Sequence, residues 1–196
     1  MVIRQFPAGL QESEKRAILR RMLETRALGD TVDASELRQY SQWATDLLLD
    51  ADTDPQGARP MAHKPGALFL TGATGYLGAF LLHALAARTD APIHCLVRAP
   101  DRPRGLSRIK AKLESYLLWD ESLRNRIIAV PGDLSKPNLG LANDQFEALA
   151  ASVDVIFHVG AIVNFLFSYP DMREANVVGT KEILRLAAMH HLKPLH

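Results

Sequence analysis

The feature that most constrains the fold of this chain is a short apolar run followed by three glycines at the start of a predicted helix. Ala67 to Leu70 predict a buried parallel strand, and the residues from Tyr76 through Ala86 carry apolar side chains at helical spacing. In the turn between them, Gly72 can adopt backbone angles closed to other residues, Gly75 lets a pyrophosphate approach the main chain, and Gly78 lets helix and strand pack closely. The amides at the helix start would face the phosphates, so the sequence predicts a dinucleotide-binding loop.

The second apolar strand, Ile93 to Val97, is followed at once by Arg98. In a dinucleotide fold this neighbourhood contacts the adenosine ribose, where an acidic residue suits a free 2′-hydroxyl and an arginine suits a 2′-phosphate. We therefore predict NADP(H) rather than NAD(H) as the ligand. The alternative interpretation is a solvated arginine at a strand end.

From Ala67 onward, predicted strands and helices alternate, which is typical of a doubly wound parallel sheet in the α/β class. The remaining predicted elements are strands at 127–130 and 153–159 and helices at 106–118, 144–151 and 172–190. Pro170 is expected to break the chain before the last helix, whose inward residues would be Val177, Ile183, Leu184 and Leu186. Right-handed crossovers predict the strand order 3-2-1-4, with ligands bound beyond the carboxyl ends of the strands.

Further candidates follow the third and fourth predicted strands. Asp133 can accept a hydrogen bond from an adenine amino group while Leu134 lies against the ring; alternatively, Asp133 caps a turn. Gly160 and Ala161 are small enough to leave room for a ribose. We interpret His158, at the end of a buried strand, as a packed and hydrogen-bonded side chain rather than a catalyst.

Composition limits the classes of protein to which this chain can belong. A formal charge of +1 over 196 residues gives no global attraction for nucleic acid or an anionic membrane, and the apolar runs are too short to span a bilayer. The single cysteine, Cys95, lies inside the second predicted strand and has no partner for an internal disulfide. We therefore expect a cytoplasmic protein with a buried structural thiol.

The chain is expected to divide in two. The sequence predicts amphipathic helices at Glu12–Ala27 and Ala34–Leu49, followed by a linker at 51–66 rich in proline, glycine and aspartate. We assign residues 1–60 to a helical linker or docking segment and residues 61–196 to a nucleotide-binding Rossmann domain.

Five motifs in order, TGATGYLG, CLVRA, GDL, HVGA and NVVGT, resemble those of the extended short-chain dehydrogenases/reductases. Within that superfamily, VPGDLSKPNLGL and SVDVIFHVGAIVNFLFSY resemble the thioester reductase domains that terminate nonribosomal peptide and polyketide assembly lines. Carboxylic acid, aminoadipate and fatty acyl-CoA reductases are similar too. The resemblance covers residues 64–196 and implies NADPH-dependent reduction of an acyl or peptidyl thioester, held on a phosphopantetheine carrier protein, to an aldehyde or an alcohol.

The resemblance also implies roles for particular residues, with no metal ligand among them. The pyrophosphate loop would comprise Thr71, Gly72, Thr74, Gly75, Tyr76, Leu77 and Gly78. Arg98 and Arg108 would bind the 2′-phosphate, and Asp133 and Leu134 would contact adenine. Gly160 and Ala161 would lie on the ribose side. Asn176 would brace the backbone of the active site.

The family's catalytic serine or threonine and its Tyr-x-x-x-Lys pair follow the fifth strand. None of the four tyrosines here is followed by lysine at that spacing, and we expect the fifth strand to begin at Leu195 and His196. Catalytic residues are therefore expected beyond His196, and this stretch alone is predicted to be inactive. Two alternatives remain at this point: another extended reductase or epimerase, and a nonenzymatic NADP-binding module.

Overall fold

The computed structural model describes residues 42–43, 45–49, 51–53 and 65–196. The chain divides into two compact units, Met1–Leu49 and Asp50–His196. In the described part of the first unit, residues 42–43 and 45–46 are helical and the chain turns at Leu47, so the predicted helix over 34–49 ends early. The predicted helix at 12–27 and the predicted boundary near residue 60 lie outside the described residues.

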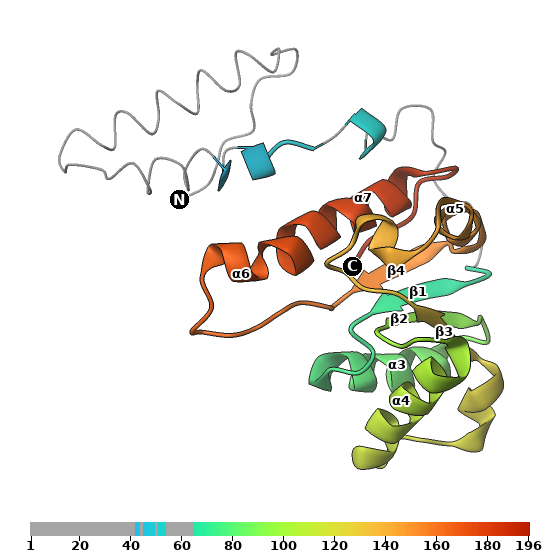
Figure 1. The fold of residues 1–196 in the computed structure, drawn as a ribbon. Coiled ribbons are helices and arrows are strands. Elements are labelled where there is room, and N and C mark those ends of the chain that lie inside the picture. Colours follow the sequence, from blue (N-terminus) through green and yellow to red (C-terminus); the bar gives the residue numbers. More distant parts are fainter. Residues whose placement is uncertain (1–41, 44, 50, 54–64) are drawn as a thin grey trace, which may run out of the picture. The chain divides into compact units, whose positions relative to one another are not determined.

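The second unit is built on four parallel strands in the order β3-β2-β1-β4 (Figure 1). They are β1 (Leu68–Thr71), β2 (Ile93–Val97), β3 (Ile127–Pro131) and β4 (Val155–His158). Every residue of β1 is buried, as expected of a strand covered on both faces. The doubly wound α/β fold and the predicted strand order are confirmed, and β4 is shorter than predicted at both ends.

Helices cover both faces of this sheet (Figure 1). On one face, α3 (Tyr76–Arg88) and α4 (Arg102–Ser115) pack their buried residues against Leu68, Leu70 and Cys95. On the other face, α5 (Asn143–Ser152) and α7 (Gly179–Ala188) pack against Phe69 and Ile156. The alternation along β1 follows from the two-residue period of a strand. Cys95 is fully buried, and this burial raises the pKa of its thiol.

Helix α4 begins four residues earlier than the predicted 106 and ends at Ser115. Asp101 caps it by accepting a hydrogen bond from the Arg104 backbone N–H at 2.8 Å, and Pro103 fits the first turn because no helical N–H is required there. The helix ends before Leu117, which adopts a positive φ of 57°.

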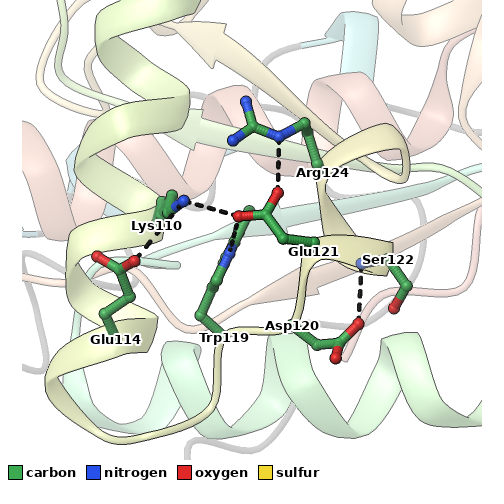
Figure 2. Close-up of polar contacts among 7 residues, drawn as sticks. All are labelled: Lys110, Glu114, Trp119, Asp120, Glu121, Ser122 and Arg124. Carbon is green, nitrogen blue, oxygen red and sulfur yellow. Dashed lines mark hydrogen bonds and ion pairs between the residues drawn. The ribbon is translucent and has the colours of Figure 1, made fainter.

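A charged cluster holds the connection between α4 and β3 in place (Figure 2). Glu121, at the start of the 3-10 turn Glu121–Asn125, accepts hydrogen bonds from Lys110 Nζ (2.8 Å) and Trp119 Nε1 (3.0 Å). Its second oxygen accepts from Arg124 Nε at 2.9 Å. These three donors lower the pKa of Glu121 to about 2, the Arg124 bond contributing most.

The last helical stretch begins at Tyr169, so the prediction that Pro170 breaks the chain was wrong. Pro170 lies in the first turn of α6 (Tyr169–Arg173), where a helix tolerates proline. A π-helical segment, Glu174–Val178, then joins α6 to α7. Its wider turn shifts the phase of the buried face. Ile183 and Leu186 are buried as predicted, whereas the other two predicted inward residues, Val177 and Leu184, are only partly buried.

Charged side chains bind main-chain groups at the amino ends of the strands. The guanidinium of Arg126, which precedes β3, donates to the carbonyl of Ala86 in the last turn of α3 and to those of Thr89 and Ala91 in the connection to β2. Asp154, which precedes β4, accepts from the Gly66 and Ala67 amides at 2.6 and 3.1 Å. Lys193 Nζ donates to the Met189 and His191 carbonyls at 2.6 and 3.1 Å.

The final residues pair with the outer edge of β4, where the fifth strand was predicted to begin. Leu195 forms a parallel bridge with Ile156, and the His158 N–H donates to the His196 carbonyl at 2.7 Å. Every helix among the described residues is too short or too polar to cross a lipid bilayer.

Candidate functional site

A cavity of about 370 Å³ lies at the carboxyl ends of the strands. The strand order reverses between β1 and β4, and the cavity occupies the crevice where such sheets bind ligands. Most of the nucleotide contacts predicted from sequence line it, namely Gly72, Thr74, Gly75, Arg98, Arg108, Asp133, Leu134, Gly160 and Ala161.

The glycine loop has a shape that side chains would prevent. Gly72 has a φ of +75°, in the left-handed region that favours glycine. A Cβ on Gly78 would lie 2.0 Å from the Gly72 carbonyl oxygen, so the first turn of α3 rests directly on the loop. Gly75 precedes α3 without donating or accepting a side-chain cap bond, which leaves first-turn amides for a ligand.

The other predicted members of the loop do not line the cavity. The Thr71 side chain is fully buried, and Gly78 is buried against Gly72. The side chains of Tyr76 and Leu77 are 70% and 62% exposed. Tyr76 packs on the rings of Phe80 and Tyr116. These two side chains lie outside the cavity, so in this arrangement any contribution to phosphate binding comes from their main-chain amides.

Two arginines gather at the β2 end of the cavity. Arg108 Nη1 donates to the backbone carbonyl of Arg98 at 2.7 Å, so a residue of α4 fixes the turn that carries Arg98. The Arg98 charge is also among the influences that lower the pKa of Asp133. Arg98, Arg108 and Asp133 therefore form one charged wall.

Asp133 makes the turn contacts that the sequence left open as an alternative. Its Oδ1 accepts from the Ser135 N–H at 2.9 Å and from the Ser135 hydroxyl at 2.8 Å. Burial acts to raise the pKa of Asp133, but these two bonds, with the charges of Arg98 and Lys136, lower it overall. The group is thus a carboxylate at neutral pH, held in place beside the cavity.

The segment after β4 forms the opposite wall. Gly160 and Ala161 both line the cavity, and a Cβ on Gly160 would lie 2.7 Å from Leu134 Cδ1. Asn176 lies outside the cavity. Its side-chain amide accepts from the Ile162 N–H and donates to the Ile162 carbonyl, both at 2.8 Å. This residue therefore fixes the backbone of the wall.

His158 is packed and hydrogen-bonded. Its Nδ1 lies 2.7 Å from Thr71 Oγ1 and its Nε2 lies 3.2 Å from Thr180 Oγ1. Burial lowers the pKa of His158, which favours the neutral ring.

Sequence reasoning missed several residues of the cavity. They are Leu96, Val97, Gly132, Ser135, Val159, Ile162 and Ala175. Gly132 follows a predicted strand end, a position at which it could have been found. Ile162 and Ala175 belong to a loop and to the π-helical segment, whose approach to the cavity no local pattern indicates.

A second cavity, of about 680 Å³, is lined by residues that include His94, Arg102 and Leu149. It contains none of the predicted nucleotide contacts, nine of which line the smaller cavity at the glycine loop. Among the described residues, no cluster of three histidine, cysteine or acidic side chains could hold a metal ion.

Comparisons with known proteins agree with this geometry. A family model for NAD-binding domains, described as "Male sterility protein", matches residues 70–196. A linear gramicidin synthase polypeptide of Brevibacillus parabrevis is 57% identical over 130 residues, which cover 66% of this chain and 3% of that polypeptide.

Solved structures of reductase domains are also similar to this chain. The terminal R domain from the myxalamid PKS-NRPS pathway aligns with a TM-score of 0.77 and 49% identity, over 79% of this chain and 40% of that one. The reductase (R) domain of a nonribosomal peptide synthetase from Mycobacterium tuberculosis aligns with a TM-score of 0.65 and 33% identity, over 76% of this chain and 37% of that one. The chain thus spans well under half the length of each of these relatives.

Proposed function

The chain belongs to the male sterility protein family of NAD-binding domains, and on that premise we propose that it binds NADPH for the reductive release of a thioester. The resemblance to reductase domains of nonribosomal peptide and polyketide synthases is confirmed by relatives that are 57% and 49% identical. The proposed substrate is an acyl or peptidyl thioester on a phosphopantetheine carrier protein, and the proposed product is an aldehyde, with an alcohol if reduction continues.

The observation that carries this proposal is the pairing of the glycine loop with Arg98 in one cavity. The loop amides suit a diphosphate, and the guanidinium, with that of Arg108, suits a 2′-phosphate. Adenine would lie by Asp133 and Leu134, and a ribose would lie by Gly160 and Ala161. NADPH would supply the hydride that reduces the thioester carbonyl.

The residues of this chain orient the nucleotide and hold no assigned catalytic role. Reduction of a thioester needs donors for the developing oxyanion. The proposal assigns none of those donors to this chain, because none of the four tyrosines in its sequence has the family's lysine spacing. We therefore expect this chain to bind NADPH without forming aldehyde from an acyl thioester.

Nucleotide titration of the 196-residue chain tests the proposal. NADPH should bind more tightly than NADH, and Arg98→Met should weaken NADPH binding by about 10- to 100-fold while changing NADH binding little, as expected when a charged hydrogen bond is lost. Arg104→Met is the matched control, because its exposed side chain contacts Asp101 outside the cavity. Equal affinity for the two nucleotides would contradict the assignment of NADPH.

A further inference from the structure

The wall of the cavity from Gly160 to Ile162 is held at both ends by one continuous set of hydrogen bonds. At one end, the Gly160 N–H donates to Thr71 Oγ1 at 3.0 Å. At the other end, the Asn176 amide binds both backbone groups of Ile162. Between them stands the His158 ring, which contacts Thr71 Oγ1 and Thr180 Oγ1.

The donors in this set can be assigned by counting hydrogens. Each threonine hydroxyl has one hydrogen to donate. Thr180 Oγ1 donates its hydrogen to the Asn176 carbonyl at 2.7 Å, so at His158 Nε2 it can only accept. The Nε2 of His158 must therefore carry a hydrogen.

The other ring nitrogen follows from the same count. A neutral imidazole with a hydrogen on Nε2 has a lone pair on Nδ1, which accepts from the Thr71 hydroxyl. Thr71 Oγ1 in turn accepts from the Gly160 N–H. Every donor in this set then has an acceptor. A charged ring would need to donate from Nδ1 as well, which would leave the buried Thr71 hydroxyl hydrogen without an acceptor in this set.

We propose that His158, as the neutral Nε2–H tautomer, is a positioning residue for the nucleotide: it couples β1 and α7 to the cavity wall Gly160–Ile162. This inference deepens the proposed NADPH function and rests on it. The ring does not touch the nucleotide in this scheme. It fixes the position of the ribose side of the cavity through two hydroxyl groups. The Thr71 hydroxyl accepts from the Gly160 N–H, and the Thr180 hydroxyl donates to the backbone carbonyl of Asn176, whose side chain holds Ile162.

The tautomer can be measured without any nucleotide. Nitrogen-15 NMR of the labelled chain should show the His158 Nε2 with the shift of a protonated nitrogen and Nδ1 with that of an unprotonated one. A spectrum with the hydrogen on Nδ1, or with both nitrogens protonated at about pH 7.5, a pH above the ordinary histidine pKa, would overturn the proposal. This readout is independent of whether NADPH binds.

A pair of variants tests the effect on binding. Thr180→Val removes the acceptor for Nε2–H at nearly constant shape, and we expect about tenfold weaker NADPH binding together with a changed shift of the Nε2 resonance. Thr180→Ser keeps the hydroxyl and should restore both. Thr89→Val is the control, since it removes the ordinary hydrogen bond from the Ala91 N–H at 3.1 Å and lies outside the cavity.

Each outcome has one interpretation. If Thr180→Val binds NADPH as tightly as Thr180→Ser, the positioning role is excluded. If Thr180→Val does not fold, Thr71→Val and Thr71→Ser make the same comparison at Nδ1. If the wild-type chain binds no NADPH but His158 has the expected tautomer, the proposed function fails while the hydrogen-bond assignment stands.

Discussion

The side-chain amide of Asn176 forms two hydrogen bonds with the backbone of Ile162, one accepted and one donated, each 2.8 Å long. Asn176 lies in the π-helical segment, and Ile162 lines the proposed nucleotide cavity. This pairing links a helix to a loop that has no regular secondary structure of its own. It makes the amide group, rather than the size of the side chain, the important property of residue 176.

Asn176→Asp should therefore weaken NADPH binding by about tenfold, although aspartate has almost the same shape. A carboxylate can accept from the Ile162 N–H but repels the Ile162 carbonyl, to which the asparagine donates. Fluorescence titration of NADPH measures the effect. Asn164→Asp is a matched control, because Asn164 Oδ1 accepts from the Leu166 N–H and an aspartate can do the same. Equal affinities for the two variants would contradict this account.

Two alanine substitutions in the glycine loop should have different consequences. Gly78→Ala would place a Cβ 2.0 Å from the Gly72 carbonyl oxygen, so we expect loss of the folded state or a large fall in the melting temperature. Gly75→Ala would place its Cβ at 3.2 Å from the same oxygen, so the chain should fold but bind NADPH poorly. Circular dichroism and nucleotide titration separate the two effects. A stable Gly78→Ala variant would show that the loop rearranges.

The free energy of unfolding should depend on pH through His158. Burial lowers the pKa of this ring in the folded state. As the pH falls, the unfolded state therefore binds a proton at a higher pH than the folded state does. The contribution of His158 is complete above its unfolded value of about 6.5 and declines as the pH falls toward the lower, folded value. In urea titrations, the stability difference between wild type and His158→Gln should shrink from about pH 7.5 to about pH 5.5, a range that brackets the unfolded value. A difference that grows in acid would contradict the neutral ring.

Glu121 provides a second test at lower pH (Figure 2). The pKa of Glu121 is lowered to about 2 by its three donors, so its stabilising effect is complete above the ordinary value of 4.5 and is lost between 4.5 and about 2. Glu121→Gln should lower the melting temperature at neutral pH, and the difference from wild type should disappear in strong acid. Glu114→Gln should have a smaller effect, since the ion pair of Glu114 with Lys110 is 3.7 Å long. Equal effects of the two variants would contradict the central place of Glu121.

The elements that sequence predicted well are those with strong local signals. The apolar runs of β1 and β2 and the glycine spacing were enough to locate the cavity, because strand ends in a parallel sheet meet at one edge. Arg98 and Asp133 were found because they closely follow strands. Pro170 was misread, since proline ends helices from within but begins them equally well, and only the capping contacts of Ser168 with Asp171 distinguish the two cases.

Two backbone irregularities and the contacts between distant segments left no comparable signal in the sequence. Asn138 and Leu139 adopt positive φ values after β3, and the π-helical turn shifts the buried face of α7. Neither feature has a residue pattern of its own. The hydrogen bonds of His158 join residues 87 and 22 positions apart, so the sequence could suggest a packed histidine but not its partners.

The charged side chains of Arg126, Asp154 and Lys193 all lie at the amino ends of the strands, bound to main-chain atoms. The opposite edge carries Gly72, Gly132 and Gly160, which contribute no side chains. The amino edge of the sheet is therefore held by charged side chains, and the carboxyl edge leaves main-chain groups open to the cavity. Loss of the charged contacts at the amino edge should reduce the amount of intact protein, and so should a side chain at any of these glycines, where a Cβ would lie under 3.0 Å from a neighbouring atom. Variation at the exposed Arg98 should instead leave abundant protein that binds the proposed nucleotide poorly.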